Sequence, residues 1–285
     1  MSISIITDSA SDISQVDAEK LNVKVLPLHV RFGDEEFLDG VTLSNSEFYN
    51  KLIETDICPK TSQISPYDYK EAFEEGLQSN SDVICLTLSS EVSGCYQSAC
   101  LAKNMLDDDE HIHIIDTRQF CISQYILAEY ASILASVGKD ADFIVDEIER
   151  LKEKVHVIAV FDTLEYLKLG GRISSAAASM GNLLSIKPVI TITDGAVDVI
   201  GKARGSKKAG NMLNQFIDSH GNISKLHPFI FAYSGFSDDA LRKYLADCGP
   251  IYGLESVDDS RIVKVGAAIG TYAGPGAFAF AYFEK

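Results

Sequence analysis

Residues 82–105 read DVICLTLSSEVSGCYQSACLAKNM and carry the clearest structural pattern in the chain. The apolar run at 82–88 is typical of a buried strand, and the segment from about Ser93 to Met105 is typical of a helix. A strand that leads through a short loop into a helix is the unit from which parallel α/β sheets are built. We therefore predict a strand–loop–helix unit here.

The same alternation continues on both sides of this unit. A hairpin tip is indicated at 32–35, and capping patterns at 44–47 and 65–68 indicate two helix starts. The remaining apolar and amphipathic segments predict strands at 2–7, 24–30 and 111–115, and helices at 12–21, 122–137 and 140–152. This pattern predicts an α/β domain over residues 1–158, with a mainly parallel sheet flanked by helices on both faces.

The pattern changes after residue 155. A capping box at 162–165 predicts a helix that ends at 170–171, and the small-residue segment 174–182 is also expected to be helical. The other expected elements are strands at 155–161, 228–233, 251–257 and 277–283, a hairpin at 186–203, and helices at 206–219 and 238–247. We predict a second α/β domain over residues 159–285, with a mixed or antiparallel sheet and helices.

Charge and composition exclude several classes of function. The 285 residues include 25 Lys+Arg and 41 Asp+Glu, which gives a net charge of −16 and argues against binding nucleic acid. No apolar run is long enough to span a membrane, and the N-terminus lacks the basic region of a signal peptide. The six cysteines show no C-x-x-C pair. We expect a cytoplasmic protein with reduced thiols.

Several polar clusters are candidates for a binding site. Ser93 and Gly94 stand where the helix after the strand begins, and unpaired N–H groups at such an end can bind an anion. Ser93 could equally be a helix cap. Thr61 and Ser62 supply hydroxyls in a loop, although taken alone they favour an ordinary loop. Arg172 follows two glycines and suits a carboxylate or phosphate, or alternatively caps the preceding helix.

Two further segments stand out. Residues 266–276, which include Tyr272, are rich in glycine and alanine. They could line a narrow apolar channel, but close packing of a helix against a sheet is the slightly favoured interpretation. Residues 201–208, which include Arg204, hold four cations and no acid. This segment is either a docking point for an acidic partner or phosphates, or an ordinary solvated loop.

Known catalytic patterns are missing from the sequence. Ser93 lacks the G-x-S-x-G context of a hydrolase, the histidines form no H-E-x-x-H pattern, and no phosphate-binding or dinucleotide-binding glycine loop occurs. We therefore expect binding rather than turnover, with no metal and no cofactor. The alternatives are a stand-alone acyl hydrolase that uses Ser93, and a structural module whose pocket is filled by its own side chains.

Taken together, the clusters resemble the DegV family of bacterial fatty-acid-binding proteins, which includes the fatty-acid-binding subunits of fatty acid kinase. The segments that carry the resemblance span nearly the whole chain: TDSASDIS (7–14), KTSQISP (60–66), LSSEVSGCYQSA (88–99), DTLEYLKLGGRIS (162–174), IKPVITITDG (186–195), KARG (202–205) and IGTYAGPGA (269–277). Each motif alone is weak, but their common order is specific.

The resemblance implies a ligand site between two α/β domains. A long-chain fatty acid such as palmitate would lie in an apolar tunnel, with its carboxylate at Thr61 and Ser93 and with Arg172 nearby. The resemblance also implies a partner, a separate ATP-dependent kinase subunit that phosphorylates the bound carboxylate to an acyl phosphate for phospholipid synthesis. Arg204 matches the position at which the family docks this kinase.

The chain departs from the family pattern at two positions. Members of the family usually have histidine near the head group, where this chain has Tyr272, and often proline where it has Ile64. A tyrosine hydroxyl still donates a hydrogen bond, but tyrosine brings no positive charge to the site. The two properties that this departure affects are the pH dependence of ligand affinity and the coupling to the kinase.

Overall fold

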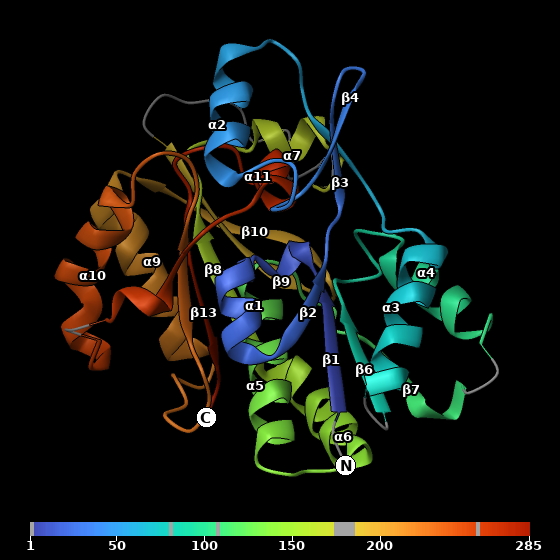
Figure 1. Cartoon of the computed structure of the whole chain (residues 1–285). Helices are drawn as coiled ribbons and strands as arrows, with labels where there is room; N and C mark the ends of the chain where they lie inside the picture. Colours follow the sequence, from blue (N-terminus) through green and yellow to red (C-terminus); the bar gives the residue numbers. More distant parts are fainter. Residues whose placement is uncertain (1–2, 80–81, 107–108, 174–185, 255–256) are drawn as a thin grey trace.

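The computed structural model describes residues 3–79, 82–106, 109–173, 186–254 and 257–285. Within these residues the strands form three sheets, with helices between and around them (Figure 1). Both chain termini lie at the same end of the molecule in this view. The predicted helix at 174–182 lies outside the described residues.

The first sheet is parallel throughout, with the strand order β2-β1-β6-β7. Its strands are β1 (Ile3–Asp8), β2 (Val23–Leu26), β6 (Asp82–Thr87) and β7 (Ile112–Asp116). This confirms the parallel sheet predicted for the first half of the chain. Strands that are buried on both faces read as continuous apolar runs, which explains why residues 82–88 gave such a clear pattern.

Helices cover both faces of this sheet. Ile84 belongs to the core formed with α5 and α6, whereas its neighbour Cys85 belongs to the core formed with α3 and α4. Successive side chains of a strand point to opposite faces, so these two cores lie on opposite sides of the sheet. The helices of this half are α1 (Gln15–Leu21), α3 (Pro66–Ser79), α4 (Cys95–Lys103), α5 (Ile122–Ser136) and α6 (Ala141–Leu151).

The second sheet has six strands in the order β10-β9-β8-β13-β11-β12, all antiparallel except for the β11–β12 pair. Its strands are β8 (Val155–Val160), β9 (Ile186–Thr193), β10 (Ala196–Arg204), β11 (Ile230–Tyr233), β12 (Ile262–Lys264) and β13 (Phe278–Phe283). This confirms the mixed sheet predicted for the second half. The domain division after residue 158 stays a prediction, and it would fall within β8.

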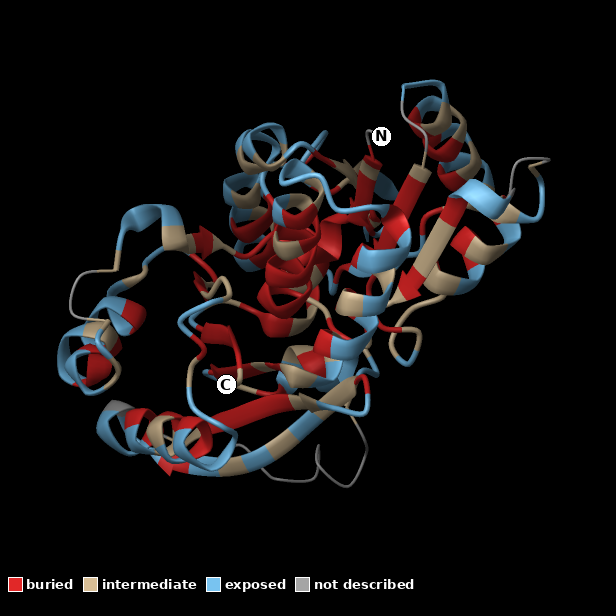
Figure 2. Ribbon diagram, turned by 90° about the horizontal axis from the view of Figure 1, so that it is seen from below, coloured by how far each residue is buried: buried red, intermediate tan, exposed pale blue. Residues whose placement is uncertain are grey.

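Helix α5 joins the two sheets into one core. It contacts β1 and β6 of the first sheet and β8, β11 and β13 of the second. Most of its residues are buried, as expected of a helix that is apolar around most of its circumference. On the second sheet, α9 (Ser206–Ser219) and α10 (Asp239–Tyr252) pack against a separate apolar cluster. Figure 2 shows buried residues concentrated in the strands and central helices.

The third sheet is small and antiparallel, with the order β4-β3-β5. Its strands are β3 (His29–Phe32), β4 (Glu35–Leu38) and β5 (Lys60–Ser62), and three short helices lie close to it: α2 (Asn45–Glu54), α7 (Glu165–Leu169) and α11 (Ala267–Ala273). The hairpin tip at 32–35 and the capping box at Ser44 are confirmed.

Three local predictions are wrong. The strand expected at 24–30 is divided between two sheets, because Pro27 has no N–H to continue the ladder. The strand expected at 251–257 does not form in the described part of this range, residues 251–254 and 257. Helix α10 runs on to Tyr252 and ends at Gly253, and β12 pairs with β11 instead. The capping box at 162–165 does not form either, since α7 begins only at Glu165.

Candidate ligand site

A cavity of about 300 Å³ lies at the carboxyl ends of β1 and β6, between the first and second halves of the chain. Ala10 follows β1 and Leu88 follows β6, and both line the cavity. In the parallel sheet, β1 lies between β2 and β6. The chain passes from β1 to β2 on one side of β1, and it later adds β6 on the opposite side. Such switch points are where open α/β sheets bind ligands.

The walls of the cavity are mostly apolar. A second cavity of about 60 Å³ shares part of this wall and continues it toward the second sheet and the N-terminal end of α5. The residues common to both cavities are Phe120, Phe161, Ile190, Ile269 and Ala273. Further in, the smaller cavity is lined largely by alanines and β-branched residues. The two cavities lie next to each other along this shared wall and together make an apolar space, and a channel that joins them stays a prediction.

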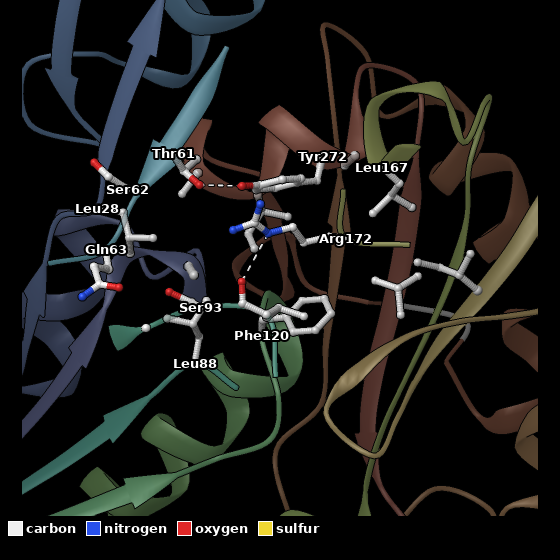
Figure 3. Close-up of a pocket in the computed structure, with 18 of the residues that line it drawn as sticks. Leu28, Thr61, Ser62, Gln63, Leu88, Ser93, Phe120, Leu167, Arg172 and Tyr272 are labelled. Carbon is white, nitrogen blue, oxygen red and sulfur yellow. Dashed lines mark hydrogen bonds between the residues drawn. The ribbon is translucent and has the colours of Figure 1, made fainter. Parts of the chain in front are cut away.

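The polar groups gather at one end of this space. The Thr61 hydroxyl, on β5, lies 2.6 Å from the Tyr272 hydroxyl, on α11. Figure 3 shows these two side chains pointing toward each other from opposite sides of the pocket. The contact joins residues that are 211 positions apart in the chain. It brings a hydroxyl pair from the two halves to the mouth of the cavity.

Among the described residues that line this cavity, Arg172 is the only one with a charged side chain. Its guanidinium lies 5.2 Å from the centre of the Tyr272 ring. It donates hydrogen bonds to two carbonyl oxygens, at 2.8 Å to Gly170 and 3.3 Å to Val92. Because carbonyl oxygens are neutral, the positive charge of this exposed side chain stays available to an anion at the mouth.

Gly170 makes room for this arrangement. A Cβ atom built on Gly170 would lie 2.4 Å from two carbon atoms of the Tyr272 ring. The ring can therefore pack against α7 only because residue 170 has no side chain.

Ser93 lies just before α4, which begins at Cys95 with Gly94 at the N-cap position. Its Oγ lies 3.4 Å from the backbone nitrogen of Cys95, so the cap interaction is weak. The hydroxyl is half-buried and borders the cavity. Burial raises the pKa of the adjacent Cys95 thiol to about 11, so this cysteine is a neutral thiol near neutral pH.

Gln63 also lines the cavity, although within the polar cluster at 60–63 the sequence singled out only Thr61 and Ser62 as ligand contacts. Its Nε2 donates a hydrogen bond of 2.8 Å to the Ser98 hydroxyl. A Cβ atom on Gly94 would collide with the Gln63 side chain, so the glycine allows Gln63 to lie across the start of α4. Its position next to Ser62 was the only sequence signal for this role.

All six residues singled out as ligand contacts line the cavity: Thr61, Ser62, Ser93, Gly94, Arg172 and Tyr272. Their roles toward a ligand stay predictions. Ser62 is exposed, and Figure 3 shows its hydroxyl turned away from Tyr272. Arg204 is exposed at the end of β10 and is not among the described residues that line the cavity, and its docking role stays a prediction.

A comparison with known proteins identifies the family. The model of the family described as uncharacterised protein, DegV family, matches residues 2–285. The chain belongs to the DegV family. A DegV domain-containing protein of Clostridium perfringens is 36% identical over 281 residues, covering 96% of this chain and 95% of that protein.

Solved structures of DegV proteins share the fold. A DegV family protein from Thermus thermophilus, described by its fatty acid binding, has a TM-score of 0.88 at 30% identity, and the match covers all of both chains. The fatty acid kinase B3 protein of Streptococcus pneumoniae, solved with linoleic acid, has a TM-score of 0.86 at 23% identity and full coverage of both chains. The second likeness concerns the fold alone.

Two kinds of feature are absent from the residues of this DegV protein that the structure describes. No helix among them is both long and apolar enough to cross a membrane. In the same residues, no group of three or more histidine, cysteine, aspartate or glutamate side chains is arranged to hold a metal ion.

Proposed function

We propose that this DegV protein binds a long-chain fatty acid such as palmitate. The acyl chain lies in the apolar space of the two cavities, and the carboxylate lies at the mouth with Thr61, Ser93 and Tyr272, near the cation of Arg172. The observation that carries this proposal is one cavity with an apolar interior and a polar mouth. The fatty acid binding described for the Thermus thermophilus relative supports it.

The apolar interior provides most of the binding free energy. Burial of one methylene contributes about 0.8 kcal/mol, so about 14 methylenes contribute roughly 11 kcal/mol before the costs of ordering the ligand. The head group then needs its hydrogen bonds satisfied but needs no tight ion pair. Hydroxyl donors meet this need and leave the carboxylate accessible at the mouth.

An accessible carboxylate also suits transfer of a phosphoryl group. The protein presents the carboxylate to a separate ATP-dependent kinase subunit, which converts it to an acyl phosphate, and Arg204 contributes to the docking surface. This step rests on the sequence resemblance. The description of the pneumococcal neighbour as a fatty acid kinase protein agrees with it.

The alternative of an acyl hydrolase receives little support from the site. The described residues that line the cavity include no histidine, aspartate, glutamate or lysine. Within the part of the chain that the structure describes, the Ser93 hydroxyl forms hydrogen bonds only with Cys95. A serine nucleophile needs an adjacent base, and the neutral Cys95 thiol does not serve as one.

The proposal is tested by mass spectrometry of the purified protein. The protein is produced in a bacterial host, denatured and extracted with organic solvent, and we expect about one equivalent of a C14–C18 fatty acid per chain. The delipidated protein should then bind palmitate. A protein that carries no acid and does not bind palmitate would contradict the proposal. Hydrolysis of an acyl ester that disappears in Ser93→Ala would favour the hydrolase instead.

A further inference from the structure

The turn that follows β1 holds two buried carboxylates that the ligand contacts do not use. It consists of Asp8, the short helix η1 (Ser9–Ser11) and Asp12. Asp8 is fully buried and Asp12 is 8% exposed. Burying a carboxylate costs free energy unless its oxygen atoms accept hydrogen bonds. The donors to Asp8 and Asp12 therefore show which segments of the chain each carboxylate holds in place.

Asp8 holds the loop that leads to Ser93. The backbone N–H of Leu88 donates a hydrogen bond of 2.7 Å to one Asp8 oxygen, and the N–H of Ala10 donates one of 3.2 Å to the other. Leu88 is the first residue after β6 and itself lines the cavity. The Asp8 carboxylate therefore fixes the start of the 88–93 loop against the turn after β1.

Asp12 holds the opposite side of the mouth. The N–H of Gly266 donates a hydrogen bond of 2.8 Å to Asp12, and the N–H of Ala267 donates one of 2.8 Å to Asp39. These N–H groups lie at the start of α11, the helix that carries Tyr272. A Cβ on Gly266 would lie 3.2–3.3 Å from oxygen atoms of Asp39 and Asp12, so the glycine permits this close approach.

We propose that Asp8 and Asp12 are positioning residues for the carboxylate of the ligand. Neither carboxylate needs to touch the ligand. Asp8 fixes the loop that presents Ser93. Asp12, together with Asp39, fixes the start of the helix that presents Tyr272 to Thr61, so the turn after β1 is joined to both sides of the mouth. This inference rests on the proposed function.

The carboxyl groups of Asp8 and Asp12 can accept hydrogen bonds in their uncharged form. Burial raises the pKa of both Asp8 and Asp12 to about 7. A large fraction of each is therefore uncharged near neutral pH and still offers an oxygen acceptor to the backbone N–H. Asparagine has the same shape and keeps one oxygen acceptor, which is enough for the Gly266 N–H at Asp12 and for the shorter bond from Leu88 at Asp8. At Asp8 it gives up the longer bond from Ala10, so it is the more conservative replacement, whereas alanine removes every acceptor.

The test compares an acid with the corresponding alcohol. Binding of cis-parinaric acid and of cis-parinaryl alcohol is measured by fluorescence for Asp8→Ala, Asp12→Ala, Asp8→Asn and Asp12→Asn. Glu129→Gln is the matched control, because Glu129 is also a buried carboxylate but pairs with Arg261 and does not line the cavity. Circular dichroism checks that each variant folds. A serine variant replaces any alanine variant that does not fold, since serine is polar but too short to reach the same N–H.

In the alanine variants we expect the affinity for the acid to fall about tenfold and the affinity for the alcohol to fall less than about threefold. The asparagine variants and Glu129→Gln should stay within about threefold of the unchanged protein for both ligands. Equal losses for acid and alcohol, or asparagine variants as weak as the alanine variants, would overturn the inference. If the unchanged protein fails to bind the acid, it is the proposed function that fails.

Discussion

The Thr61 hydroxyl and the Tyr272 hydroxyl, 2.6 Å apart, form a hydrogen bond between the first and second halves of the chain. Either hydroxyl can be the donor, and the one that accepts keeps its own proton. That proton is then free to donate to a ligand carboxylate. The pair therefore joins the two halves at the mouth and leaves one hydroxyl proton available to the proposed ligand.

The first prediction concerns the charge of residue 272. Tyr272→Phe removes the hydroxyl, and we expect the affinity for palmitate to fall by about 0.5–1.5 kcal/mol because one hydrogen bond is lost. Tyr272→His adds a group that becomes cationic below about pH 6.5, so its affinity for the anion should rise as the pH is lowered from 8 to 6. Isothermal titration calorimetry across this range measures both effects.

Tyr67 provides the matched control for these substitutions. It is 73% exposed and does not line the cavity. Tyr67→Phe and Tyr67→His should leave both the affinity and its pH profile unchanged. A Tyr272→His variant whose pH profile matches that of the unchanged protein would show that residue 272 does not face the carboxylate.

The second prediction concerns the length of the acyl chain. Ala273 lines both the main cavity and the smaller one behind it, so Ala273→Leu should obstruct the passage between them. The measurement is competition with saturated acids of C8 to C18. In the unchanged protein the binding free energy should improve by up to about 0.8 kcal/mol for each added methylene, and in Ala273→Leu this gain should stop at a shorter acyl chain. The shortest acids serve as the internal control, because their affinity should not change. If affinity stops rising at the same acyl-chain length in the variant and in the unchanged protein, the result would argue against a continuous tunnel.

Much of the architecture could be predicted from local patterns. Buried parallel strands give continuous apolar runs, which is why β1, β6 and β7 were found close to their true ends. Local patterns failed where a short apolar run had two possible structures. Residues 251–257 read as a strand, yet α10 extends to Tyr252 with Pro250 inside it. Periodicity cannot separate a short strand from the end of a buried helix.

The site was less accessible to sequence reasoning than the fold. Taken on the residues alone, Thr61 was interpreted as an ordinary loop position, and only the family resemblance linked it to Ser93 and Arg172. The contact between Thr61 and Tyr272 spans 211 positions, so no local pattern encodes it. Asp12 was expected only as part of the helix at 12–21, because its partner Gly266 lies 254 positions away in the chain.

The third prediction concerns stability against pH. The pKa values of Asp8 and Asp12 are raised by burial from 3.8 to about 7, so the folded protein binds protons more tightly there than the unfolded chain does. The stabilisation linked to these protons is complete below about pH 4 and is lost as the pH rises toward about 7 and beyond. For these two groups, the free energy of unfolding should fall by a few kcal/mol between pH 4 and pH 8.

Urea unfolding at several pH values tests this directly. The double variant Asp8→Asn/Asp12→Asn cannot titrate at these positions, so its free energy of unfolding should fall less steeply over the same range. The Glu129→Gln variant keeps both aspartates and should retain the contribution that they make to the slope. If the free energy of unfolding depends on pH in the same way in the double variant and in the unchanged protein, the two carboxylates do not titrate between pH 4 and pH 8.

The last prediction separates ligand binding from docking. Arg204 is exposed at the end of β10 and lies outside the cavity lining, so Arg204→Glu should leave the affinity for palmitate unchanged. Reversal of a charge in the basic 201–208 segment should instead weaken association with an acidic surface of a kinase subunit. We expect the rate of acyl phosphate formation with the kinase of the same organism to fall about tenfold or more, since a charge reversal replaces attraction by repulsion. Lys139→Glu, the same reversal at the exposed turn between α5 and α6, is the control and should not change the rate. If both variants lower the rate equally, the effect comes from the net charge of the protein, and Arg204 has no special part in docking.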